Sequence, residues 1–397
     1  MKRRTLVLSD VHLSTLVRGP SESGSWMVYR RPEHAPDALL ARTIEHESRR
    51  ALHDGAAFEL VLNGDLFDLD APPASDAAGP SSYATCRHDQ GAAGLMTQIL
   101  DDHPVVTGVL RDVLTRNQRV VFVPGNHDAQ LALPSVRIVI ARALLSPYGT
   151  RGAIIFRSWF HRTHDGIHIE HGHLYDPLCT MERLFAQRTP TGEARLEDTI
   201  GSVSTHYGQA LFGLLNPYAV DPFAAMSGDA IQALKECIAR AACRAELATL
   251  LVCMRELMLI QRSQESSRDV AAWLALVAQE TGVPPSLLET HRGLAAPKAD
   301  AADLTLAVTR AYDYGKDVDT RLRDVMRKLA RLHQVRAVVM GHTHEPFSYQ
   351  DPSGVYFANS GSWTPLAGLS DARPVGSVVV IESNGPHFHL RREDVRP

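Results

Sequence analysis

Short apolar runs alternate with longer amphipathic segments along the first part of the chain. Several runs stop at Gly, Asp or Asn, which is typical of buried strands that end in functional loops. We expect strands over 5–9, 58–63, 119–124, 153–157 and 167–171. Helical periodicity runs through 36–53 and 92–117, with a break near Pro104, whereas 79–90 is small and polar and predicts a loop. This alternation predicts parallel strands joined by crossover helices.

The pattern changes after about 177. The chain then reads as mostly helical, rich in Ala, Leu, Arg and Glu, with breaks at 189–192, 216–222 and 282–285. Strand patterns return at 335–340, 354–358 and 376–381. The sequence therefore predicts an α/β (α+β) core formed by 1–178 and 335–397, interrupted by a large helical insertion over 179–334.

Composition narrows the class of protein. Hydrophobic residues make up 44% and charged residues 22%, as in ordinary globular proteins, and the net charge of −4 argues against a stable nucleic-acid partner. The apolar run at 247–254 is too short to span a bilayer, no targeting segment is recognisable, and five cysteines without a CxxC pair predict no disulfide. We expect a cytoplasmic protein without a transmembrane segment; its oligomeric state stays open.

Five short segments that follow predicted strands carry the chemistry. Because residues at the carboxyl ends of strands converge at one edge of a sheet, these segments are expected to meet. They are Asp10-Val-His12, Gly64-Asp65-Leu-Phe-Asp68, Gly125-Asn126-His127-Asp128, His171-Gly-His173 and Gly341-His342-Thr-His344.

These residues are suited to bind two divalent cations about 3.5–4 Å apart, with the carboxylate of Asp65 bridging them. Imidazole favours Mn, Fe or Zn, with Ni as an alternative, over Mg or Ca. In an extended segment, the two His of each His-x-His pair would project to the same side. One ion is expected to take Asp10, His12, Asp65 and His344, and the other Asp65, Asn126, His171 and His342.

The ordered blocks D-x-H, GD-x-x-D, GNH-D, H and GH-x-H resemble the calcineurin-like metallophosphoesterase superfamily over 1–178 and 335–397. The resemblance implies a four-layer sandwich in which two β-sheets pack between helices, with the dimetal site at the sheet edges. It also implies that His127 protonates the leaving oxygen or stabilises the transition state, that Asp68 orients His127, and that a metal-bridging hydroxide is the nucleophile.

The layout is most similar to UDP-diacylglucosamine hydrolases and their relatives, although those enzymes commonly have Arg where this chain has His127. Protein phosphatases of the superfamily carry an Arg where this chain has Leu69, and double-strand-break repair nucleases share two of the blocks. We expect a phosphoesterase acting on a phosphodiester or a pyrophosphate-linked small molecule. A phosphomonoesterase or a nuclease is the alternative. The complete ligand set disfavours a non-enzymatic scaffold.

Other polar residues admit simpler interpretations. Asp128 is expected to cap the helix that follows it, Asp176 to begin a turn before Pro177, and His164 and His168 to lie on the surface or behind the ligands. His173 could contact substrate or bond to a carbonyl. The segment 359–363 is either a turn that supports the site or a purely structural turn. The apolar stretch 247–260 either forms a groove for an apolar part of the substrate or is ordinary helix core.

Overall fold

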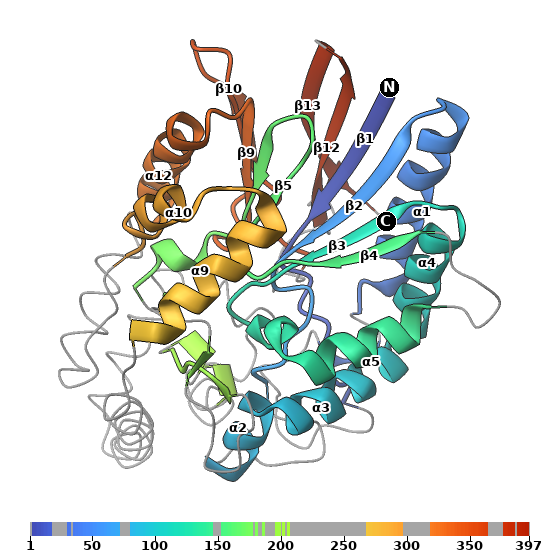
Figure 1. The fold of residues 1–397 in the computed structure, drawn as a ribbon. Helices are drawn as coiled ribbons and strands as arrows, with labels where there is room; N and C mark the ends of the chain where they lie inside the picture. Colours follow the sequence, from blue (N-terminus) through green and yellow to red (C-terminus); the bar gives the residue numbers. More distant parts are fainter. Residues whose placement is uncertain are drawn as a thin grey trace, which may run out of the picture.

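A computed structural model describes residues 2–17, 30–32, 35–71, 80–145, 152–177, 179–181, 185–186, 195–199, 201–202, 205–206, 267–296, 318–363, 376–385 and 387–396. In it, two β-sheets pack against each other, with helices on both outer faces (Figure 1). The expected four-layer α/β sandwich is therefore confirmed.

The larger sheet has the strand order β13-β12-β1-β2-β3-β4. Its strands are β1 (Lys2–Leu8), β2 (Ala57–Asn63), β3 (Arg119–Val123), β4 (Ala153–Phe156), β12 (Gly376–Asn384) and β13 (His387–Val395). Strands β1 to β4 run parallel, as predicted, while β12 pairs antiparallel with β1 and β13 with β12. The polar strand β13 was not expected from the sequence, because its side chains are mostly only partly buried at the sheet edge and lack an apolar pattern.

Side chains of the larger sheet alternate between its two faces. In β1, Leu6 and Leu8 face the helices, whereas Val7 faces the second sheet. In β2, Leu60 faces the helices and Val61 faces the second sheet. Both faces are thus buried, which explains why these strands read as continuous apolar runs.

The outer face of this sheet is covered by helices that carry apolar stripes (Figure 1). They are α1 (Asp37–His53), α3 (Asp89–Asp102), α4 (Pro104–Thr115) and α5 (Pro134–Leu144). Pro104 marks the expected break, since it occupies the first turn of α4. The loop expected at 79–90 is wrong: α2 (Pro80–Arg87) and the start of α3 lie there. The fully buried guanidinium of Arg87 bonds to Asp70 at 2.8 Å, a tertiary contact that holds α2 despite its poor helical composition.

The smaller sheet has the order β10-β11-β9-β6-β5. Its strands are β5 (His161–Arg162), β6 (Ile167–Ile169), β9 (Ala337–Met340), β10 (Phe347–Gln350) and β11 (Tyr356–Asn359). Neither β5 nor β10 was predicted, because β5 has only two residues and β10 is partly exposed and lacks an apolar run. Helix α12 (Val318–His333) covers the outer face of this sheet with Leu322, Met326 and Leu329.

The rest of 179–334 is described only in part. Short strands β7 (Phe185–Ala186) and β8 (Arg195–Leu196) pair there, although helix was expected. Helices α9 (Ser267–Thr281) and α10 (Pro285–Arg292) are separated at the predicted break, where Gly282 has a φ of 70°. The predicted breaks at 189–192 and 216–222 and the apolar stretch 247–260 lie outside the described residues. The groove and the division at 178 and 334 stay predictions.

Within the described part of the chain, we find no helix that has both the length and the apolar character needed to cross a membrane.

Candidate metal centre

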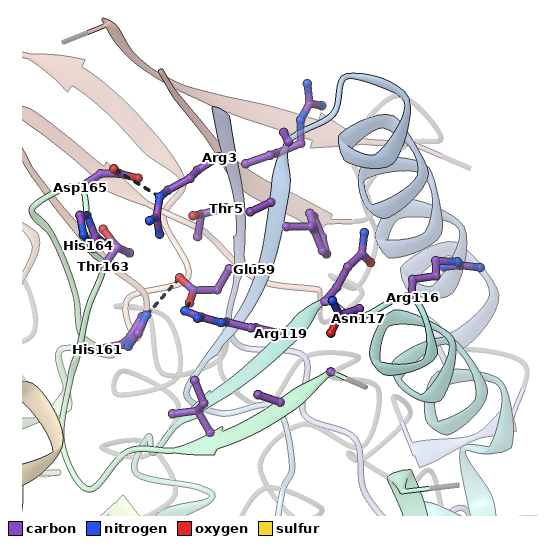
Figure 2. A pocket seen from close by; sticks show the side chains of 18 of the residues that line it. Arg3, Thr5, Glu59, Arg116, Asn117, Arg119, His161, Thr163, His164 and Asp165 are labelled. Carbon is purple, nitrogen blue, oxygen red and sulfur yellow. Dashed lines mark hydrogen bonds and ion pairs between the residues drawn. The ribbon is translucent and has the colours of Figure 1, made fainter. Parts of the chain in front are cut away.

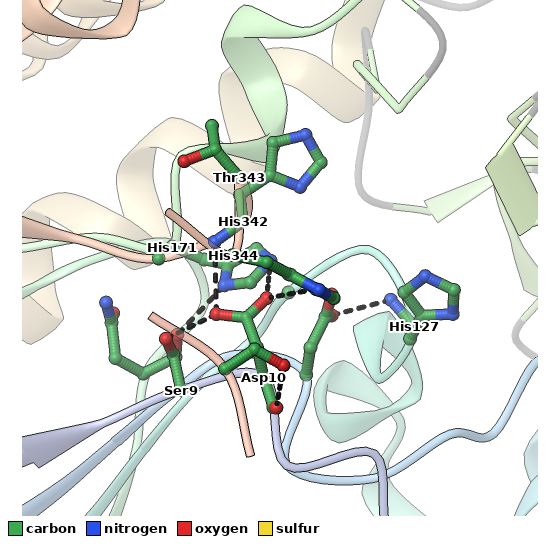
Figure 3. A network of polar contacts seen from close by, with 12 residues as sticks. Ser9, Asp10, His127, His171, His342, Thr343 and His344 are labelled. Carbon is green, nitrogen blue, oxygen red and sulfur yellow. Dashed lines mark hydrogen bonds and ion pairs between the residues drawn. The ribbon is translucent and has the colours of Figure 1, made fainter. Parts of the chain in front are cut away.

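The five predicted segments meet where the two sheets present the carboxyl ends of their parallel strands. Asp10, Asp65 and Asn126 follow β1, β2 and β3 of the larger sheet, while His171 and His342 follow β6 and β9 of the smaller one. Figure 3 shows Asp10 close to His171 and His344, with His127 to one side. The predicted convergence at one edge is therefore observed.

Asp10, His12 and His344 form one group of potential ligands. The Nε2 atom of His344 lies 3.2 Å from Oδ1 of Asp10 and 3.4 Å from Nε2 of His12. Burial, followed by the nearby His127, lowers the pKa of His12 to about 3. His12 is therefore neutral, which is the form of imidazole that binds metals.

Asp65, His171 and His342 form a second group. The Nε2 atom of His171 lies 3.1 Å from Oδ2 of Asp65, and its Nδ1–H donates to the carbonyl of Asn63 at 2.9 Å. The Nε2–H of His342 donates to Oδ2 of Asp176 at 3.0 Å. In each imidazole one nitrogen is thus held by a hydrogen bond and the other is left for a cation, the arrangement usual around bound metals.

Asp65 lies between the two groups and is almost fully buried. Its Oδ1 accepts from the backbone N–H of His127 at 2.8 Å, and its carbonyl accepts from the N–H of Val11 and of His12 at 2.9 and 3.0 Å. Burial raises the pKa of Asp65, but His171 and His127 oppose this and hold it well below its usual value. Gly125 is required beside it, because a Cβ there would overlap the Asp65 carboxylate.

Unsatisfied polar atoms in this cluster fit a pair of bound cations. Oδ1 of Asp10, Oδ1 of Asn126 and Nε2 of His171 are buried, and none of them has a hydrogen bond of acceptable geometry. Such atoms are costly to bury without a partner. Because oxygen and imidazole nitrogen are ligands for borderline divalent metals, cations placed among these atoms would satisfy them.

The backbone of the site is strained. Five of the seven predicted ligands adopt a left-handed conformation, which is unfavourable for residues with a side chain and is concentrated at functional sites. Their φ values are 54° for Asp10, 56° for His12, 51° for Asp65, 70° for His342 and 59° for His344. The His-x-His segments are therefore turns, and the extended geometry assumed from the sequence is wrong. His342 and His344 lie in different groups, the division expected from the sequence, but a turn and not an extended segment separates them.

His127 lies at the edge of the cluster with 5% of its surface exposed. Its Nδ1 is 3.4 Å from Oδ1 of Asp68, which is long for a hydrogen bond but is the pairing expected from the sequence. Burial lowers the pKa of His127, but the carboxylates of Asp65 and Asp68 outweigh burial and raise it to about 9. His127 also lies within reach of His12 and Asp65, so the geometry alone permits either ligation or proton transfer.

Two acidic residues contribute more than the sequence indicated. Asp128 makes no capping bond to the short 3₁₀ turn that follows; its carboxylate accepts from the N–H groups of Gly125, Leu66 and Phe67 at 2.7, 2.9 and 3.3 Å. The expected cap is therefore wrong, and Asp128 instead ties the β2 and β3 loops together. Asp176 bonds to His342 from more than one hundred residues away, a contact that no local pattern shows.

Three other interpretations can now be compared with the structure. His168 is fully buried, not on the surface, and its Nε2 lies 2.8 Å from Oε2 of Glu170, the residue that precedes His171. His173 is 6% exposed, and its ring lies 5.5 Å from that of His171 without joining either ligand group. The segment 359–363 supports the site: the Asn359 side chain donates to the carbonyl of Gly341 at 2.7 Å, and the N–H of Trp363 donates to the carbonyl of Asp10 at 2.9 Å.

Comparison with known proteins yields only weak likenesses. No family model and no curated protein sequence matches this chain. A single mutant of Vps29 from Entamoeba histolytica is 26% identical over 18% of this chain and 46% of its own, with a TM-score of 0.13. Wild-type Vps29 of the same organism, complexed with Zn²⁺, is 22% identical over 19% and 47%, with a TM-score of 0.11. The chain thus spans about half the length of these Vps29 structures.

A dimetal phosphatase from Danio rerio is similar over 99% of this chain and 96% of its own, at 12% identity and a TM-score of 0.38. At such TM-scores these likenesses carry no weight for function, which has to be argued from the residues of the site itself.

Proposed function

We propose that this chain is a dimetal-dependent phosphoesterase. The observation that carries the proposal is Asp65, a buried carboxylate that lies within ligand distance of His12 and His127 on one side and of His171 and His342 on the other. Asp10, His12 and His344 would hold one cation, and Asn126, His171 and His342 the other. The order of these blocks and the four-layer fold further support membership of the calcineurin-like metallophosphoesterase superfamily.

The metals, His127 and Asp128 would each have a separate role in the reaction. When bound, two such cations neutralise charge on phosphoryl oxygens and lower the pKa of water. His127, paired with Asp68, holds a proton at the edge of the cluster and would donate it to the leaving oxygen. Asp128 fixes the loops that carry Asp65 and His127, so that donor and ligands keep their spacing.

For the substrate we propose a phosphodiester or a pyrophosphate-linked small molecule, with a phosphomonoester as the alternative. The sequence resemblance supports this order, because a His at the position of His127 is the pattern of the wider phosphodiesterase group of the superfamily. The net charge of −4 counts against a nuclease. Four imidazoles among seven ligands favour Mn, Fe or Zn. The free thiols of Cys86 and Cys179 support a location in a reducing compartment such as the cytoplasm.

The test is metal-dependent hydrolysis. The metal-free protein would be reconstituted with Mn, Zn, Fe, Ni or Mg and assayed with bis-p-nitrophenyl phosphate and p-nitrophenyl phosphate. Asp65→Asn is the inactive control, and Asp112→Asn, an exposed aspartate on α4, is the matched one. Diester cleavage that is lost only in Asp65→Asn supports the proposal. Faster cleavage of the monoester would favour the alternative, and equal activity in both variants would contradict a dimetal mechanism.

A further inference from the structure

A cleft lies at the end of the molecule opposite the metal centre. It measures about 990 Å³ and opens between the amino ends of β1 to β4 and the turn that joins β5 to β6 (Figure 2). Arg3 lines the cleft at one end of β1, whereas Asp10 follows the other end. At about 3.3 Å per residue this separates the two places by roughly 20 Å. A small molecule in the cleft would therefore not touch the metal ligands.

The charge of the cleft is opposite in sign to that of the whole chain. Its lining contains six arginines, of which Arg4 and Arg116 are paired with carboxylates outside the cleft. The other four face only two carboxylates of the lining, Glu59 and Asp165, although the chain as a whole has a net charge of −4. A concave surface with one sign of charge concentrates the field and attracts counter-ions. The cleft is thus a candidate site for an anion.

The two carboxylates neutralise their neighbours only loosely. Nε of Arg3 lies 3.8 Å from Oδ1 of Asp165, and one terminal nitrogen of Arg119 lies 3.9 Å from Oε1 of Glu59. Both distances exceed hydrogen-bond length. Glu59 instead bonds to Nε2 of His161 at 3.1 Å. Figure 2 shows the guanidinium groups of Arg3 and Arg119 directed at the same space, where their N–H donors are available to a ligand.

Two further arginines of the lining bond to neutral acceptors. Arg157 donates to the carbonyl of Glu280 at 2.5 Å and to Nδ1 of His161 at 3.1 Å, and Arg162 donates to the carbonyl of His333 at 3.1 Å. Burial lowers the pKa of Arg157, against the opposing influence of nearby carboxylates. Because the hydrogen-bond acceptors of Arg157 and Arg162 are uncharged, an anion in the cleft would still be attracted to both guanidinium groups.

We propose that this cleft binds a small molecule carrying two or more phosphate groups, at a site separate from the metal centre. Guanidinium groups match phosphate oxygens with paired hydrogen bonds, and Arg3 and Arg119 would each hold one phosphate. The two arginines bonded to neutral acceptors supply the remaining charge. This site does not depend on the proposed function, because none of its residues belongs to the ligand groups.

Isothermal titration of the metal-loaded protein with propane-1,3-diphosphonate tests the proposal, because the C–P bonds of this probe resist hydrolysis. The cleft variant is Arg3→Gln/Arg119→Gln. The matched control, Arg142→Gln/Arg331→Gln, removes the same charge from exposed positions on α5 and α12. We expect one binding event per chain to weaken at least tenfold in the cleft variant and less than twofold in the control. Turnover of a chromogenic ester should be unchanged in both.

Absence of binding to the wild-type protein, a change of less than tenfold in the cleft variant, or equal weakening in the two variants would overturn the proposal. If Arg3→Gln/Arg119→Gln fails to fold, the titration is repeated with Arg119→Gln alone. This variant should fold, because the Arg119 side chain is 58% exposed and lies at the start of β3. The expected loss is then at least threefold, compared with Arg142→Gln.

Discussion

At the scale of single residues, the geometry of the site is compatible with two different roles for His127. It pairs with Asp68 as a proton donor would, yet it also lies within ligand distance of the atoms of His12 and Asp65. The two roles make opposite predictions for metal content, and a single substitution separates them.

We expect His127→Ala to retain two metal ions and to lose about 10²–10⁴-fold in kcat toward bis-p-nitrophenyl phosphate, the usual contribution of a general acid. Metal content by mass spectrometry and kcat by absorbance provide the check. His46→Ala, at a largely exposed position on α1, is the control. Loss of one metal ion from His127→Ala would show that this imidazole is a ligand.

Substitution of Asp176 tests whether a residue that bonds to a predicted ligand, and is not itself one, controls metal affinity. Its carboxylate accepts the Nε2–H of His342 at 3.0 Å and so leaves Nδ1 for a cation. We expect Asp176→Ala to weaken binding of one of the two metal ions by about 10–100-fold, as is typical when such a partner is removed. Competition with a chromogenic chelator measures this, with Asp112→Ala as the control. Unchanged affinity for both ions would mean that the contact is incidental.

At the scale of elements, a buried polar network joins α10 and α12 to the strand that precedes His171. Glu170 accepts from Nε1 of Trp159 and the hydroxyl of Tyr175 through one oxygen, at 2.8 and 2.9 Å. Its other oxygen lies 2.8 Å from Nε2 of His168 and 3.2 Å from Nε2 of His291, which belongs to α10. His333 of α12 completes the chain, with Nε2 3.0 Å from Nδ1 of His291.

His291 is the central member of this network, and its ring also stacks on Trp159 at 4.2 Å. We expect His291→Ala to lower the free energy of unfolding by about 2–4 kcal/mol, because it creates a cavity and removes partners of buried polar groups. Urea denaturation followed by circular dichroism is the measurement. His46→Ala should change stability by less than about 0.5 kcal/mol. A similarly small change in His291→Ala would show that the network does not hold α10 in place.

At the scale of the whole molecule, the two sheets meet through an apolar interface but end in a strained polar cluster. Five left-handed residues and several unsatisfied buried atoms lie at that edge. Both features are unfavourable in the metal-free chain and would be offset by bound cations. A pair of cations bound here would therefore also act as a clamp between the sheets.

Metal removal should lower the melting temperature of the wild-type protein by several degrees, since a ligand present at about 100 times its Kd stabilises the folded state by about 2.7 kcal/mol. Differential scanning calorimetry with and without a chelator is the measurement. Asp65→Asn should show a much smaller difference, because it has already lost the shared ligand, whereas Asp112→Asn should behave as wild type. Identical melting temperatures with and without metal would contradict a cation clamp.

The sequence by itself determined the layered fold class, most strand positions of the core and the set of residues that converge at the sheet edge. It could do so because apolar runs and strand-end loops are local signals, readable without knowing what packs against them, whereas the four layers were implied by the family resemblance. It failed at the polar strand β13, at the short strands β5 and β10, and at α2, where local patterns are weak and distant contacts decide the conformation.

Only the tertiary structure showed the left-handed backbone at His342 and His344, the contacts of Asp128 and Asp176, and the network around Glu170. The same holds for the basic cleft, whose arginines come from separate strands. These features depend on distances between segments that lie far apart along the chain. No local pattern encodes such distances, because they are set when the two sheets pack together.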